Sequence, residues 1–321
     1  MMNVPYFTHP ILACGTVGLF VLWGATPSTA QAPFVTSHGL STGVRLERAA
    51  SQEVPETKRP SLLYVSDAKT NAVYVFSYPN GVPIGTLTGF SQPAGLCADG
   101  AGDVWIADLG AQQLVEYAHG GSKRIATLKD PNYYPNACSV DPTSGNLAVA
   151  NMSMAGSSGS GSIAIYEKAH GAPKIYTDPS LYFIEYCGYD AKGNLYADGF
   201  TSSSAFLFAE LPHGNRTFTD IMVPQRYGFL GPVQWDGTHV ALGGGKRIYQ
   251  VAIRGKNARI LDVTPLHHGD VLAFWIQRPR VIGVNPADGT VRFWRYPNGG
   301  APTKTLTGFS DPVGVTVSLG T

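Results

Sequence analysis

The sequence predicts an all-β protein: a six-bladed β-propeller of four-stranded antiparallel blades, closed when the C-terminal strand pairs into the first blade. One reason is an internal repeat. YPNGVPIGTLTGFSQPAGLCAD, from Tyr78 to Asp99, recurs as YPNGGAPTKTLTGFSDPVGVTVS, from Tyr296 to Ser318. Turn aspartates at positions 99, 141, 190 and 236 lie 42, 49 and 46 residues apart, which suits four strands and four turns per unit. Abundant Gly and Pro with few charged residues favours short strands and tight turns over helices.

The N-terminal segment predicts export. Residues 11–25, ILACGTVGLFVLWGA, are apolar but short for a membrane span, and Ser28-Thr29-Ala30 is an acceptable cleavage site. We therefore interpret residues 1–30 as a signal peptide and expect a periplasmic or extracellular protein. An uncleaved anchor is the alternative, because no Lys or Arg precedes the apolar run. It would be the protein's only membrane contact. Residues 31–60 lack apolar periodicity and predict a flexible linker.

The propeller is expected to span residues 61–321. Its first unit begins at Leu62 and has only three strands, predicted over 62–66, 72–78 and 85–88. The final stretch, Val313–Ser318, reads as an inner strand without a unit of its own. Both irregularities disappear if this last strand completes the first blade, which also pairs an exposed sheet edge. The five complete units begin at Ala94, Asn136, Glu185, Pro232 and Val271.

The units also resemble a known family. PNACSVDPTSGNLAVAN and GYDAKGNLYADGF are similar to the repeat of NHL-type six-bladed propellers, and to gluconolactonase and SMP-30-like propellers of the exported bacterial type. The resemblance covers Leu62 to Gly320. It implies the fold, but the superfamily contains hydrolases, lyases and binding proteins, so it does not by itself imply an activity.

Aromatic residues gather in the loops that lead into the inner strands. In a propeller these loops open on one face, at the mouth of the central channel, and a concave aromatic mouth suits ligand binding. Packing between blades is the alternative role. The leading hypothesis is therefore a non-enzymatic module that binds a small molecule, a glycan or a protein. The predicted ligand-binding residues are Tyr133, Tyr134, Tyr182, Phe183, Tyr186, Tyr227 and Phe229.

A metal-dependent hydrolase is the second hypothesis. The resemblance to the lactonases implies a channel cation, Ca²⁺ or Mg²⁺, and Glu185, Asn136 and Asp270 are the candidate ligands. Against it, Pro312–Val315 carries no acid where those enzymes have a first-blade glutamate. A lyase is third, with His267 or His268 as the catalytic base. No cofactor is expected if the protein is only a binding module.

Two further residue sets repeat from blade to blade. Five blades place Asp or Asn where the second strand ends, either as a cation-binding rim or, as we favour, to form the next turn. These residues are Asp67, Asp108, Asn151, Asp198 and Asn285. Cysteines occur on three successive inner strands, and alternation lets only Cys97 and Cys138 face each other. An exported protein permits a disulfide there, but three free, buried thiols are the favoured interpretation.

Charge adds one exclusion. The formal charge of +1 provides no basic footprint for nucleic acid, so we expect no nucleic-acid partner. We expect a monomer.

Overall fold

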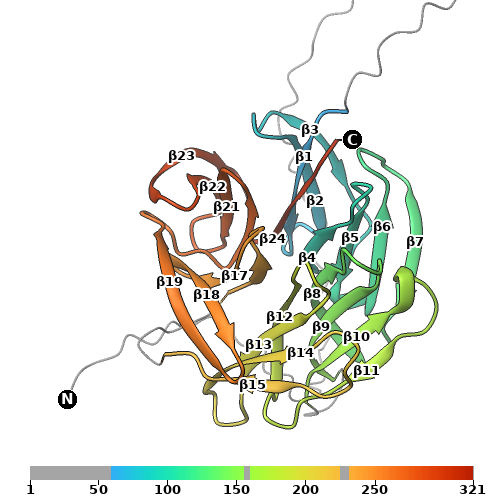
Figure 1. Cartoon of the computed structure of the whole chain (residues 1–321). Coiled ribbons are helices and arrows are strands. Elements are labelled where there is room, and N and C mark those ends of the chain that lie inside the picture. Colours follow the sequence, from blue (N-terminus) through green and yellow to red (C-terminus); the bar gives the residue numbers. More distant parts are fainter. Residues whose placement is uncertain (1–58, 155–159, 225–230, 321) are drawn as a thin grey trace, which may run out of the picture. The chain divides into compact units, whose positions relative to one another are not determined.

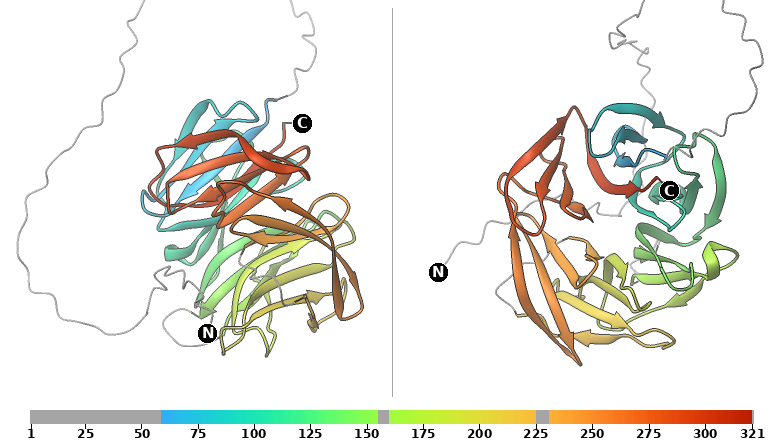
Figure 2. Two further views of the ribbon diagram at one scale, coloured as in Figure 1. Left: turned by 90° about the vertical axis from the view of Figure 1, so that its left-hand side faces the viewer. Right: turned by 45° about the horizontal axis from the view of Figure 1, so that its top comes forward.

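The structure is a computed structural model that describes residues 59–154, 160–224 and 231–320. In these ranges six separate sheets of four antiparallel strands surround a common axis (Figures 1 and 2). The predicted six-bladed propeller is confirmed. No helix of the described residues is long and apolar enough to span a membrane.

The ring closes in blade 1, whose sheet has the order β24-β1-β2-β3. β24 pairs antiparallel with β1, from the pair Leu62 and Ser318 to the pair Asp67 and Pro312. It is therefore the inner strand that the first unit lacks in the sequence, as predicted. The blade consists of β1 (Leu62–Asp67), β2 (Ala72–Ser77), β3 (Pro83–Leu87) and β24 (Pro312–Ser318).

Each of the other five blades uses four consecutive strands, starting at the axis. Blade 2 has β4 (Pro93–Ala98), β5 (Val104–Asp108), β6 (Gln113–Tyr117) and β7 (Arg124–Lys129). Blade 3 has β8 (Tyr133–Val140), β9 (Leu147–Met154), β10 (Ser162–Tyr166) and β11 (Lys174–Tyr176). Blade 4 has β12 (Phe183–Tyr189), β13 (Leu195–Phe200), β14 (Phe206–Leu211) and β15 (Thr219–Ile221). Blade 5 has β16 (Val233–Trp235), β17 (Val240–Gly244), β18 (Arg247–Arg254) and β19 (Asn257–Pro265). Blade 6 has β20 (Ala273–Gln277), β21 (Arg280–Asn285), β22 (Thr290–Arg295) and β23 (Gly299–Thr307).

The hydrophobic core lies between neighbouring blades. Each sheet is covered on both faces, so inner and second strands carry runs of buried residues instead of strict alternation, as in LLYVSD of β1. One cluster joins Tyr64 of blade 1 to Ile106 of blade 2, and another joins Ile282 and Phe293 of blade 6 to Leu63 of blade 1. The blades therefore stabilise one another.

The turn aspartates act locally. Asp99 Oδ1 accepts hydrogen bonds from the backbone N–H groups of Ala101 and Asp103, both at 2.9 Å. Asp190 does the same for Lys192 and Asn194, at 2.8 and 2.9 Å. A carboxylate that binds the backbone two to four residues ahead fixes the turn between the first and second strands. This explains why the spacing of these residues reports the blade period.

Candidate functional site

A cavity of about 250 Å³ lies on the propeller axis, and all six inner strands line it. The lining comes mainly from the middle and the C-terminal ends of these strands. The segments are 95–98 of β4, 137–140 of β8, 186–189 of β12, 233–235 of β16, 273–275 of β20 and 314–315 of β24. The cavity therefore lies toward the end of the channel opposite the aromatic loops that the sequence singled out.

Small residues and large rings together shape this cavity. At Gly95 and Gly314 an added Cβ would come within 2.6 and 2.4 Å of a backbone oxygen on the neighbouring inner strand, so the strands approach closely there. Trp235 and Trp275 contribute indole rings to the lining. The Trp275 Nε1 is buried and has no hydrogen-bond partner among the described residues. The lining can thus surround an apolar body, and one indole N–H is left without an acceptor.

Two β-bulges place Asn136 and Glu185 together. Each is the extra residue where the register shifts between the inner and second strand, in β8 and in β12. Bulges redirect side chains, which is why they occur near functional sites. The Asn136 Nδ2 donates to the Glu185 carbonyl oxygen at 2.7 Å and lies 3.4 Å from Glu185 Oε2. The predicted neighbourhood of these two residues is therefore present, one position before the cavity-lining Tyr186.

A second carboxyl group, Asp198, belongs to this group of residues. Asp198 is the register partner of Tyr186 and is only 2% exposed, and its Oδ1 has no hydrogen-bond partner. Burial raises the pKa of Asp198 well above its usual value, and the nearby charge of Glu185 raises it further. Burial also raises the pKa of Glu185 to about 7. Two such groups do not both ionise easily at neutral pH.

The repeated Asp and Asn residues at the second-strand ends divide into two kinds. The Asp67 and Asp108 carboxylates accept backbone N–H bonds from the loop that leads into their own inner strand, at 2.7 Å from Ser310 and 2.6 Å from Ser91. Asn285 accepts from Ala287 at 2.9 Å. The predicted bond to the following turn is therefore present in blades 1 and 6, whereas Asp108 of blade 2 holds the loop that precedes its inner strand instead. In blades 3 and 4, Asn151 and Asp198 each keep a buried oxygen without a partner.

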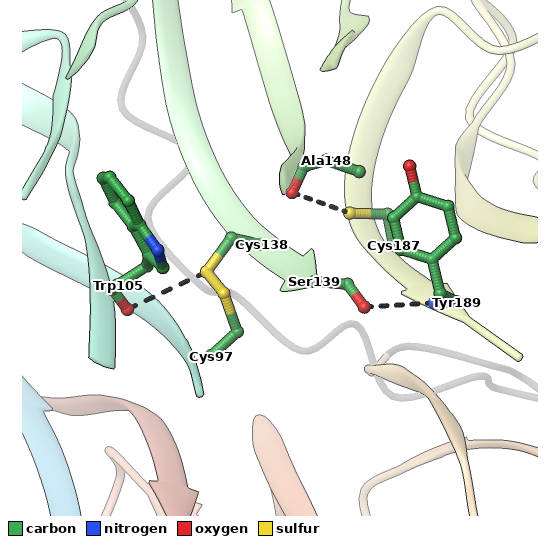
Figure 3. Close-up of a disulfide and its surroundings, with 7 residues drawn as sticks. All are labelled: Cys97, Trp105, Cys138, Ser139, Ala148, Cys187 and Tyr189. Carbon is green, nitrogen blue, oxygen red and sulfur yellow. Dashed lines mark hydrogen bonds between the residues drawn. A yellow bond between two sulfur atoms is a disulfide. The ribbon is translucent and has the colours of Figure 1, made fainter. Parts of the chain in front are cut away.

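Cys97 and Cys138 form a disulfide between the inner strands of blades 2 and 3 (Figure 3). The pair is the one that strand alternation allowed, but the preferred prediction of three free thiols is wrong. Alternation fixed the face of each cysteine, whereas the close approach of β4 and β8 decides that the two sulfurs meet. Cys187 is free and buried, and its thiol donates to the Ala148 carbonyl at 3.9 Å. All three cysteines line the axial cavity.

The remaining predicted site residues are dispersed. Tyr182 and Phe183 form an edge-to-face pair with ring centroids 4.9 Å apart, and Tyr133 and Tyr134 are half-buried at the start of β8. The Tyr186 hydroxyl donates to the Leu272 carbonyl at 3.1 Å, between blades 4 and 6. Tyr227 and Phe229 lie outside the described residues.

The loop before β20 holds the other predicted catalytic and metal-binding residues. His267, His268 and Asp270 are all exposed. The backbone of His267 is held in place: its N–H donates to the Gly300 carbonyl and its carbonyl accepts from Trp294 Nε1. No contact joins Asp270 to Glu185 or Asn136, so the three predicted metal ligands do not form one group among the described residues.

Sequence reasoning missed one acidic group. One ligand oxygen from each of Asp99, Asp103 and Glu116 lies within 4.8 Å of the others in blade 2. Burial, together with the nearby charges of Asp103 and Asp99, raises the pKa of Glu116 to about 7. The strand pattern could have revealed this group, because Glu116 of β6 pairs with Trp105 of β5, just beyond the turn that holds Asp99 and Asp103. Half-buried acids in a turn are common without a ligand, so we assign no function to this cluster.

Comparison with known proteins identifies the fold and no family. No protein-family model matches the sequence, and no curated protein is significantly similar. A crystal structure of a nidogen/laminin complex contains a similar chain, with a TM-score of 0.65 and 10% identity, over 81% of this chain and 98% of that one. A crystal structure of a protein of unknown function from Bacteroides caccae has a TM-score of 0.59 and 12% identity, covering 81% and 99%. Identities this low establish the propeller alone.

Proposed function

We propose that this propeller is a binding module that holds a small, largely apolar ligand in its axial cavity. The observation that carries the proposal is a cavity of about 250 Å³ to which every inner strand contributes. An apolar cavity of about 150 Å³ is enough for benzene, so this one suits a molecule of one or two rings. The aromatic residues predicted at the opposite mouth would contact a larger ligand or a protein.

Binding is also the use of this fold that a similar structure illustrates. The similar chain comes from a crystal structure of a nidogen/laminin complex. For the present chain this supports the general class of binding module.

A blocking substitution tests the proposal. Ala98 lines the cavity, whereas Ala287 is exposed in a turn of blade 6, so Ala98→Trp should fill the cavity and Ala287→Trp should serve as the matched control. Indole and naphthalene are the probes. At a hundredfold excess over Kd, we expect them to raise the Tm of the wild type and of Ala287→Trp by about 5–10 °C. No shift in the wild type, or an equal shift in Ala98→Trp, would refute the cavity as the site.

A metal-dependent hydrolase of the lactonase type is the second candidate, and the Glu185 and Asp198 pair favours it. Asn136, Glu185 and Asp198 would supply the oxygen ligands of a Ca²⁺ or Mg²⁺ ion, and the unpartnered Asp198 Oδ1 fits that role. A bound cation would polarise a substrate carbonyl. Metal analysis and Tm with and without chelator test this. Stoichiometric metal that is lost in Glu185→Gln supports it, and a metal-free protein with no chelator effect excludes it.

Export and membership of the NHL and SMP-30-like group belong to the same proposal. The Cys97–Cys138 disulfide supports export, because disulfides persist in oxidising compartments. Mass spectrometry of the exported protein should find an N-terminus just after Ala30. Retention of residues 1–30 would instead indicate an anchor.

A further inference from the structure

A second, unassigned site lies at the seam between blades 6 and 1. The face of blade 6 that meets blade 1 carries Ile282 and Phe293, which pack into one cluster with Leu63 and Val65. Side chains two residues apart on a strand share a face. Arg280 on β21 and Arg295 on β22 therefore extend this same face, beyond the apolar cluster and toward solvent.

The two arginines are direct neighbours across the sheet. Arg280 and Arg295 are register partners, and Gln277 of β20 is the next partner in the row. Like charges directly opposite each other in an antiparallel pair are destabilising. A protein that keeps such a pair at the end of a buried face gains from an anion that neutralises it.

No carboxylate of the described residues pairs with either arginine. The neighbouring arginines are both paired: Arg278 with Asp236 at 2.8 Å and Arg292 with Asp288 at 2.5 Å. Within the described residues, Arg280 and Arg295 form no ion pair. Arg280 instead contacts the Tyr78 hydroxyl of blade 1, whose pKa is raised by burial while the Arg280 charge and hydrogen bond oppose the rise.

The partners of a nearby lysine are neutral as well. A third cation, Lys304 of β23, donates to the carbonyl oxygens of Asn80 and Pro79, at 2.5 and 3.4 Å. Its register partner is Phe293, so it extends from the same face of blade 6. Arg280 and Lys304 thus meet acceptors that carry no charge.

We infer that this seam binds a tetrahedral oxyanion, the phosphate or sulfate group of a ligand, between Arg280 and Arg295. Guanidinium groups present paired N–H donors that match phosphate and sulfate oxygens, and such charge-assisted bonds are strong where water is partly excluded. Arg280 is half-buried and Arg295 is exposed, so the site is reachable from solvent. It is separate from the axial cavity and does not depend on the proposed function.

Calorimetric titration of the full chain with inorganic phosphate tests the site, with Arg295→Gln and Arg280→Gln as blocking variants. Arg259→Gln is the matched control, because Arg259 is exposed on β19 and its register partner is Ala252. We expect phosphate to bind the wild type and Arg259→Gln equally, and each blocking variant at least tenfold more weakly. Sulfate should behave like phosphate, and acetate at equal ionic strength should bind more weakly.

Stability in chloride provides a second readout. Without phosphate and at low ionic strength, Arg295→Gln should be at least as stable as the wild type, since it removes a repulsion. Phosphate also stabilises proteins generally, so only the difference between variants counts. Equal phosphate binding by all four proteins would overturn the inference. Acetate binding as tight as phosphate binding would overturn the assignment to tetrahedral oxyanions.

Discussion

Blades 1 and 4 carry an aspartate at the same place in the repeat and use it differently. Both oxygens of Asp67 accept backbone N–H groups, from Thr70 and Asp311 on Oδ1 and from Ser310 on Oδ2. Asp198 leaves Oδ1 unpartnered, and its charged form is disfavoured by burial and by Glu185. The comparison teaches that recurrence does not establish a single role. The same residue type closes a turn in one blade and keeps a buried oxygen without a partner in another.

The disulfide joins blade 2, where the aspartate is fully bonded, to blade 3, where the equivalent asparagine keeps an unpartnered oxygen. Its removal should have the largest effect on stability. It joins residues 41 apart, so loop-closure entropy predicts a loss of about 4 kcal/mol in unfolding free energy for Cys97→Ala with Cys138→Ala. Urea unfolding without reductant measures this. Cys187→Ala, which removes a free thiol from the same cavity lining, is the control and should cost about 1 kcal/mol or less. Equal losses, or three free thiols by mass spectrometry, would contradict the bridge.

Asp67→Asn should cause the next largest loss of stability. Whichever way the new amide turns, its NH₂ group faces a backbone donor that formerly had an acceptor, at a fully buried position. We expect a loss of about 2–4 kcal/mol, measured by urea unfolding at pH 7. Because Asp67 holds the loop into β24, amide exchange should accelerate first in β24 and β1. A smaller loss of unfolding free energy for Asp67→Asn than for Asp198→Asn would contradict the different roles given to the two aspartates.

Asp198→Asn should change stability least, and at high pH it should stabilise the protein instead of destabilising it. A carboxyl whose folded pKa is raised contributes most to stability below its unfolded pKa, and the contribution is lost as pH rises through the folded pKa. For Glu185 this window extends from about 4.5 to about 7, and the Asp198 pKa is raised in the same direction. At pH 8 the variant should therefore be at least as stable as the wild type, with a gain of up to about 1 kcal/mol. Its unfolding free energy should also fall less than that of the wild type between pH 5 and 8. A parallel pH profile would show that Asp198 titrates normally.

The fold could be predicted from the sequence because residues that form local turns recur once in each blade. Aspartates such as Asp99 and Asp190 bind their own turns, and the two YPNG segments flank the seam, so repeat spacing and closure follow from nearby residues. Strand ends were less certain: β8 begins at Tyr133, three residues before the predicted start at Asn136.

The candidate site could be predicted from the sequence only in part. The sequence put Glu185 and Asn136 near inner-strand starts, but only the bulges bring them into contact. Trp235 and Trp275 were indistinguishable from core residues, because alternation gives the face of a strand and not its distance from the axis. The Cys97–Cys138 pair was named as the one possible disulfide but not preferred, because the closeness of β4 and β8 is a tertiary property. Tyr227 and Phe229 stay predictions.

The pairing of β24 with β1 also sets an order of events during synthesis. Leu62 leaves the ribosome about 250 residues before its partner Ser318. At roughly 5–20 residues per second, β1 waits about 10–50 s with its inner edge unpaired. That edge is a template for pairing with other chains, so the nascent protein is vulnerable until its last strand arrives. Any agent that masks β1 during this interval, a chaperone or a neighbouring blade, would raise the yield of folded protein.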